Sequence, residues 1–484
     1  MSNESIGIRQ PLNHSNTRTK AIFWQSTLRD RLLSFDKIVI IALLFIHYSL
    51  LQPINVSGSF FLRLFTADKV IYYLALIVIL RQVLLRRRFY VIRQIPGVWL
   101  LIPVVFLVFT SNYLGTKSGV STYSWKNLYD ITSEVNYWKT SWQEIGKILL
   151  MITTVLVLNS YSKIFFYLKW SLYFIVFLAL VSFLPLEPSD IFPDSQKAYQ
   201  IEESIRGQTT LASYTDYSTT KRHTMLWIDS NNYAYFLIPA LFVIILLINY
   251  GQRVIRPHLR FVLFLIFGFL AVNLLLTQSR GGLFCFLGGF TVLLYQYREK
   301  RNQWIIPIMV FVFGSLVIFF FTDMGEIIQN LFTRFYYAFL LVGDESARQT
   351  VSGAESGRVI TAWLAIQDIL ERPLLGWGGA FQVGRFSTSG NHVGYLNLIG
   401  KYGFIGGGLM FLFLYKNLRS FQRTLRKTIR RDSFELHMGY CIVAIYIAVI
   451  LSGLFRTFSP IGIAPLAISF YLVSKYNTRR PEVS

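Results

Sequence analysis

Apolar runs long enough to cross a lipid bilayer recur along the whole chain. A transmembrane helix needs about 20 mostly apolar residues to cross the hydrocarbon. The predicted spans begin near Ile38, Val70, Gly97, Ile148, Ile164, Asn231, Phe261, Gly281, Trp304, Phe404, Met438 and Ile461. This pattern predicts an all-α polytopic membrane protein with about 12 transmembrane helices, forming one transmembrane domain over residues 38–474.

The composition agrees with a membrane protein. Only 15% of the 484 residues are charged and 53% are hydrophobic, which leaves too little polar surface for a soluble protein of this length. Aromatic residues make up 17% of the chain, as suits lipid-facing helices with interfacial belts. Cys285 and Cys441 lie inside apolar runs and form no metal-binding pattern. The N-terminal segment is polar and basic, and we expect no cleaved signal peptide.

The net charge of +22 can be explained by membrane topology. Clusters of lysine and arginine fall on alternate connections between the predicted spans, as the positive-inside rule requires. They lie within residues 81–93, 253–260, 298–301, 416–431 and 475–480. We therefore expect cytoplasmic tails at residues 1–37 and 475–484, and a nucleic-acid partner is not needed to explain the charge.

The opposite face of the membrane then carries three long polar loops. They cover about residues 112–146, 186–230 and 322–391. Loops of this length are usually functional or disordered. The second contains Arg206 and Arg222, and part of the third is predicted to be helical, beginning after a Ser356 cap and ending before Pro373.

The first group of chemically interesting residues is the segment Thr277-Gln278-Ser279-Arg280-Gly281-Gly282, between two apolar runs. An arginine at a membrane boundary is costly unless it is paired or snorkels to water. A guanidinium binds phosphate oxygens in a bidentate fork, and small glycines let a ligand approach the backbone. Arg280 is therefore either a phosphate ligand or a snorkelling arginine that marks a hairpin.

A second group lies in the third loop. Arg358 is placed in the first turn of the predicted loop helix, which is followed by Arg372-Pro-Leu-Leu-Gly-Trp-Gly-Gly379. Trp377 within that run is either a platform for a sugar ring or part of the interfacial aromatic belt.

The third group begins with Asn391-His392 and continues through Tyr395 to Gly403-Phe-Ile-Gly406. Histidine is the natural general base near neutral pH. Helical spacing places His392 and Tyr395 on one face, although a lone histidine at a helix start is often structural.

These groups together resemble a known family. Residues 355–408, ESGRVITAWLAIQDILERPLLGWGGAFQVGRFSTSGNHVGYLNLIGKYGFIGGG, resemble the signature loop of the O-antigen ligase/polymerase family in order and spacing. SRGG at 279–282 is similar to that family's Ser-Arg-Gly motif, and IDSNNYAYFLIPAL at 228–241 to its Asn-containing span entry. The similarity covers about residues 228–415. One departure is that the family has His-Asn, whereas here Asn391 precedes His392.

The resemblance implies a GT-C-like glycosyltransferase that uses neither a metal nor a cofactor. Its donor is a glycan on a polyprenyl diphosphate, and its acceptor is either another lipid-linked glycan or lipid A core. The implied location is the bacterial inner membrane, with the active site on the periplasmic face.

Under this resemblance Arg280 and Arg358 stabilise the leaving diphosphate and His392 is the general base. We expect further substrate contacts from Arg206, Arg222, Ser279, Trp377 and Tyr395. Two large outer loops slightly favour polymerisation over ligation.

A transporter or flippase for an anionic lipid-linked saccharide is the alternative. Transporters place their sites on broken helices near the membrane midplane, often with internal repeats, and no repeat is visible in this sequence.

Overall fold

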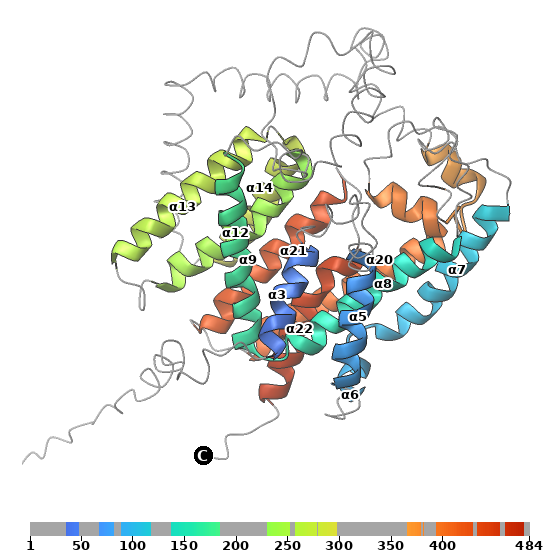
Figure 1. Ribbon diagram of the computed structural model, residues 1–484, viewed down its shortest axis with the longest axis horizontal. Helices are drawn as coiled ribbons and strands as arrows, with labels where there is room; N and C mark the ends of the chain where they lie inside the picture. The colour runs from blue at the N-terminus through green and yellow to red at the C-terminus, as the bar shows by residue number, and fades with distance from the viewer. Residues whose placement is uncertain are drawn as a thin grey trace, which may run out of the picture.

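A computed structural model describes residues 35–47, 67–81, 89–117, 137–183, 230–251, 257–277, 279–297, 365–378, 381, 394–428, 433–454 and 460–478. All regular elements within these ranges are helical. In chain order they are α3 (Phe35–His47), α5 (Ala67–Ile79), α6 (Phe89–Arg93), η3 (Val98–Leu100), α7 (Leu101–Lys117), α8 (Tyr137–Val157), α9 (Tyr161–Val181), α12 (Ser230–Gly251), α13 (Pro257–Leu276), α14 (Arg280–Gln296), α20 (Gly394–Thr428), α21 (Phe434–Ser452) and α22 (Pro460–Thr478). Figure 1 shows them gathered in one bundle, with α13 and α14 on one side and α7 on the other.

Several of these helices are long and apolar enough to cross a membrane. The described residues contain five such stretches: Val98–Gly115, Tyr161–Val181, His258–Leu276, Gly394–Arg426 and Phe434–Ser452. Large apolar side chains also cover the outside of the bundle, including Phe106 at 69% exposure and Tyr295 at 70%. A water-soluble protein rarely exposes apolar surface on this scale, whereas a membrane protein does so where its helices meet lipid. The chain is an all-α membrane protein.

The helices follow the apolar runs of the sequence. Within the described residues a helix lies at or next to the start of each predicted span, although α8 begins at Tyr137 and ends at Val157, so the span predicted from Ile148 was placed too late. The span predicted near Trp304 lies outside the described residues. The predicted loop 112–146 is shorter than expected, because α7 continues to Lys117 and α8 already begins at Tyr137. The polar end of α7 and the polar start of α8 are helical because these two helices pack against each other. Most of the predicted loops 186–230 and 322–391 lies outside the described residues.

One end of the bundle is marked by polar contacts among helix termini, and we call it the Ser279 end. The Tyr233 hydroxyl, at the start of α12, donates to Asn273 Oδ1 near the end of α13, at 2.9 Å. It also lies 3.4 Å from the Ser182 hydroxyl, which follows α9. α14 begins at this end, directly after Ser279. The end of α9, the start of α12, the end of α13 and the start of α14 therefore meet in one polar region.

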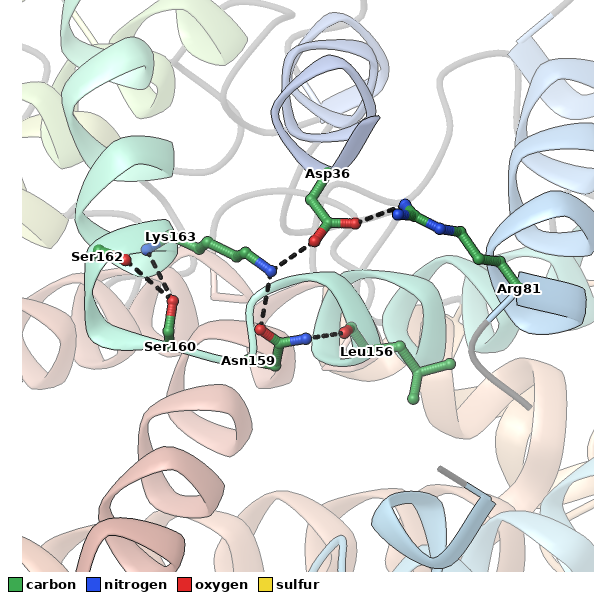
Figure 2. A network of polar contacts seen from close by, with 7 residues as sticks. All are labelled: Asp36, Arg81, Leu156, Asn159, Ser160, Ser162 and Lys163. Carbon is green, nitrogen blue, oxygen red and sulfur yellow. Dashed lines mark hydrogen bonds and ion pairs between the residues drawn. The ribbon is translucent and has the colours of Figure 1, made fainter. Parts of the chain in front are cut away.

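The opposite end, which we call the Asp36 end, is held by a buried carboxylate. Asp36, in the first turn of α3, pairs with Arg81 beyond α5 at 2.9 Å and with Lys163 in the first turn of α9 at 2.6 Å. Lys163 also donates to Asn159 Oδ1 at 2.9 Å, as Figure 2 shows. A buried carboxylate needs such partners to offset its lost hydration. This network joins α3, α5 and α9 and brings two cations, Arg81 and Lys163, to this end.

Candidate functional site

Ser279 determines how α14 begins. Its hydroxyl accepts a hydrogen bond from the Gly282 amide at 3.2 Å, and its own amide donates to Thr277 Oγ1 at 3.2 Å. This is the N-cap arrangement, in which a serine oxygen satisfies an amide of the first helical turn. Arg280 is therefore the first residue of α14, although its side chain lies outside the described residues. The first turn of α14 holds no acidic residue, and the amides of a helix N-terminus attract negative charge.

Gly282 brings two of the family-like segments together. A methyl group at this position would lie only 2.5 Å from Ala234 Cβ in the first turns of α12. The segment 279–282 therefore packs directly on the Asn-containing start of α12. Deeper in the bundle, a Cβ at Gly289 would lie 2.7 Å from the Ala444 carbonyl oxygen of α21. Glycine thus allows α14 to approach both α12 and α21 closely.

The element α20 is two helices joined by a sharp bend at Gly403. This glycine has φ 65° and ψ −176°, which is not helical. The rings of Tyr395 and Phe411 are 5.4 Å apart, whereas 16 residues of straight helix would separate them by about 24 Å. Residues 394–402 therefore fold back on the helix that follows. The helix after the bend begins at Phe404, where the sequence predicted that a span begins.

The backbone of the predicted Pro-Leu-Leu-Gly-Trp-Gly run satisfies the helix ends at this bend. Four hydrogen bonds join the two segments: Trp377 N to Gly400 O at 2.8 Å, Gly378 N to Lys401 O at 2.8 Å, Phe404 N to Pro373 O at 2.7 Å and Ile405 N to Leu374 O at 3.4 Å. Helix termini leave such groups without intrahelical partners, and a membrane interior offers no water to replace them. Residues 373–378 therefore allow a helix to break here.

Trp377 has a packing role in this loop. Its indole nitrogen donates to the Asp368 carbonyl at 2.6 Å, and the Arg372 guanidinium lies 4.1 Å from its ring. The residue is only 9% exposed, so it does not lie in an interfacial belt. The Arg372 guanidinium covers one face of the ring, and it would have to move before a sugar could stack there. Sugar stacking on Trp377 stays a prediction. Residues 365–371 before it are helical and end before Pro373, as predicted.

Tyr395 connects the short helix 394–402 to the end of α21. Its hydroxyl donates to the Ile450 carbonyl, and its amide donates to the Gly453 carbonyl at 3.3 Å. The same turn of α21 reaches α14, because a Cβ at Gly288 would lie 2.3 Å from Leu451 Cδ1. Tyr395 therefore anchors the helix start that follows His392 in the sequence. His392 itself, with Arg358, Arg206 and Arg222, lies outside the described residues.

A buried ion cluster between α8 and α20 was not predicted from the sequence. Glu144 Oε1 lies 2.7 Å from Lys147 Nζ and 3.7 Å from Lys401 Nζ. Lys401 is the last residue but one before the bend and is only 7% exposed. The signal in the sequence was a single lysine between Gly400 and Tyr402, which the motif comparison left unassigned.

The ion cluster adjoins further polar groups of α7 and α8. The Ser111 hydroxyl donates to the Leu375 carbonyl at 2.5 Å, and Asn112 Nδ2 donates to Ser141 Oγ at 2.9 Å. A Cβ at Gly378 would lie 2.5 Å from Asn112 Cα, so the loop packs directly on α7. The bend in α20 is therefore surrounded by polar groups from three elements.

Acidic and metal-binding side chains do not gather in the described ranges. No three His, Cys, Asp or Glu side chains there could hold a metal ion together. The long loops lie largely outside these ranges, so metal-independent chemistry stays a prediction.

Comparison with models of protein families gives no match, and comparison with curated proteins gives no similar sequence. The resemblance to the O-antigen ligase/polymerase family therefore depends on the quoted motifs alone.

Proposed function

We propose that the protein is a membrane glycosyltransferase of the O-antigen ligase/polymerase type, with about twelve spans and a GT-C-like fold. It moves a glycan from a polyprenyl diphosphate to an acceptor sugar at the periplasmic face of a bacterial inner membrane. The Ser279 end of the bundle is the periplasmic end.

The convergence of family-like segments supports this function. The starts of α12 and α14 pack together at Gly282, and the last turn of α21 contacts both α14 and Tyr395. Residues 373–378 hold the bend that follows Tyr395 along α20. Segments separated by more than a hundred residues thus meet at one end of the bundle, as a shared site requires.

The residues supply the chemistry of glycosyl transfer. An acceptor hydroxyl attacks the anomeric carbon, a new C–O bond forms, and the bond to the diphosphate breaks. The departing diphosphate gains negative charge, which Arg280 and Arg358 stabilise, with Arg206 and Arg222 assisting. His392 takes the hydroxyl proton.

Replacing Arg280 or Arg358 by lysine tests the diphosphate role. Lysine keeps the charge but loses the bidentate fork. We expect each variant to transfer glycan about 10–100 times more slowly, the range that a lost charge-assisted hydrogen bond explains. The measurement is chain growth or lipid A core modification in proteoliposomes with a defined lipid-diphosphate glycan. Arg423→Lys, at the far end of α20, is the matched control. Full rates for both site variants at normal protein levels would remove the bidentate role.

Labelling of single cysteines tests the orientation. The native thiols Cys285 and Cys441 are buried, so their background labelling is low. We expect a membrane-impermeant maleimide added from outside to label Ser352→Cys and not Ser420→Cys. The cytoplasmic position of the second follows from the basic residues around it. The reverse labelling pattern contradicts the orientation, and with it the periplasmic site.

Transport of an anionic lipid-linked saccharide is the second candidate function. The bend at Gly403 beside buried Lys401 and Glu144 favours it, because transporters bind substrates at broken helices with buried charges. The bend lies at the start of a span, however, and transporter sites lie near the midplane. Proteoliposomes separate the two functions: a transferase lengthens or relocates the glycan, whereas a transporter moves an unchanged substrate across the bilayer.

A further inference from the structure

Lys401 is a buried ammonium whose hydrogen-bonding capacity is poorly used. The residue is 7% exposed, and within the described part of the chain its acidic partner is Glu144 Oε1 at 3.7 Å. At that distance the contact is at best a weak hydrogen bond and occupies one of the three donors of the ammonium. The same carboxylate oxygen is engaged by Lys147 at 2.7 Å. Buried charges are costly unless they are paired and hydrogen-bonded, so Lys401 needs a further acceptor.

The charges of this cluster do not cancel. Lys401 and Lys147 carry two positive charges and Glu144 carries one negative charge, which leaves +1 in a cluster that is buried at Lys401 and open to the outside at Lys147. Lys147 is the more open of the two lysines, with its side chain 41% exposed. An anion that reaches the cluster from the side of Lys147 would balance the charge and accept the free donors of Lys401.

The cluster is packed by other helices than those that pack on α14. It lies between α8 and α20, next to α7, whereas α14 packs on α12 and α21. Figure 1 shows α14 and α7 on opposite sides of the bundle. Both regions belong to the Ser279 end, because Glu144 lies about two turns after the start of α8, and Ser111 lies about two turns before the end of α7.

We propose that Lys401 and Lys147, balanced by Glu144, hold the diphosphate of a second polyprenyl-linked glycan, the acceptor. This inference depends on the proposed function and deepens it, since only polymerisation needs two lipid diphosphates at once. The acceptor keeps its diphosphate through the reaction, and the charge on that group does not change. A lysine acts as a point charge, which suits a diphosphate that is bound equally well before and during the reaction. The donor diphosphate, in contrast, gains charge during transfer, and its proposed ligands are arginines.

The first test counts binding sites for farnesyl diphosphate on the full detergent-solubilised chain by calorimetric titration. We expect two sites on the native protein, one on Arg280→Gln and one on Lys401→Gln, with affinity at the lost site falling by about 10–100-fold. A single site on the native protein, or two sites on Lys401→Gln, would overturn the inference. Because the probe carries no glycan, its binding does not depend on glycan transfer. If the protein binds two probe molecules but transfers no glycan, only the proposed function is wrong. If it transfers glycan but binds one probe molecule, only the second site is wrong.

Variants of Glu144 separate a binding role from a structural ion pair. Glu144→Gln removes the competing carboxylate, and we expect about tenfold tighter binding at the Lys401 site. A structural pair instead predicts lower stability and unchanged affinity for this variant, which would overturn the inference. Should Lys401→Gln fail to fold, Glu144→Gln/Lys401→Gln removes both charges at similar volume, and we expect it to fold with one site only.

Competition identifies the source of the anion. We expect inorganic pyrophosphate to displace farnesyl diphosphate from the Lys401 site, while phosphatidylglycerol in mixed micelles does not displace it at equal concentration. Equal displacement by phosphatidylglycerol would make this a general lipid headgroup site and overturn the acceptor role. In steady-state transfer, Lys401→Gln should raise the KM for the acceptor with little change in kcat, whereas Arg280→Lys should lower kcat.

Discussion

The His392→Ala protein should transfer glycan about 10²–10⁴ times more slowly than the native protein, the range typical for loss of a general base. A neutral imidazole can take the proton from the acceptor hydroxyl as the new glycosidic bond forms. The measurement is product formation in proteoliposomes, with protein abundance matched across variants. Donor binding should survive the substitution, because the proposed phosphate contacts belong to Arg280 and Arg358.

His392→Asn is the control that separates a base from a cap. The histidine comes two residues before α20 begins at Gly394, and asparagine can still cap a helix. An asparagine has no basic nitrogen, so we expect His392→Asn to be as slow as His392→Ala. Near-normal transfer by His392→Asn would assign the histidine a structural role and leave only the arginine electrostatics.

The spans were predictable from the sequence because their signal is local. An apolar run such as that of α9, 161–181, is long enough to cross a membrane, and it forms a helix because only a helix satisfies its own backbone there. The helix ends were less predictable, since α7 and α8 continue through polar residues that have packing partners. Lys/Arg clusters predicted the alternation of connections, and helix termini that meet at the Ser279 end and the Asp36 end agree with that alternation.

The sequence marked residues for a candidate site, and it did not show how they are arranged. Ser279, Trp377 and Tyr395 were identified as substrate contacts, yet in the structure they cap a helix, pack under Arg372 and anchor α20 to α21. These roles depend on partners far away in the sequence. The pairing of Glu144 with Lys401 spans 257 positions, and no local pattern of either residue indicates it.

The bend in α20 is the clearest case of structure beyond local sequence. Residues 394–428 contain enough apolar residues for one long helix, and a glycine inside a helix is common enough to be overlooked. Only the fold shows that Gly403 is unhelical, that Tyr395 reaches Phe411, and that residues 373–378 fill the break. The short helix 394–402 before the bend therefore runs in a different direction from the helix that follows it.

Gly403→Ala should therefore prevent normal folding. The conformation at φ 65°, ψ −176° is open almost only to glycine and costs other residues about 1–3 kcal/mol. An added Cβ would also lie 2.0 Å from the Leu374 carbonyl oxygen, which belongs to the loop that satisfies the bend. We expect severalfold less protein in the membrane, because a loss of 1–2 kcal/mol is enough to change abundance by that amount. The measurements are membrane abundance and thermal unfolding of the solubilised protein by size-exclusion chromatography.

Gly408→Ala is the matched control for this prediction. It lies on the same element, five residues further on, and an added Cβ there meets nothing within 4 Å. Alanine is the better helix former by about 0.5–1 kcal/mol, so Gly408→Ala should be as stable as the native protein or slightly more stable. Equal behaviour of the two variants would mean that α20 runs straight through Gly403. Lys401 would then lose its place beside the 373–378 loop.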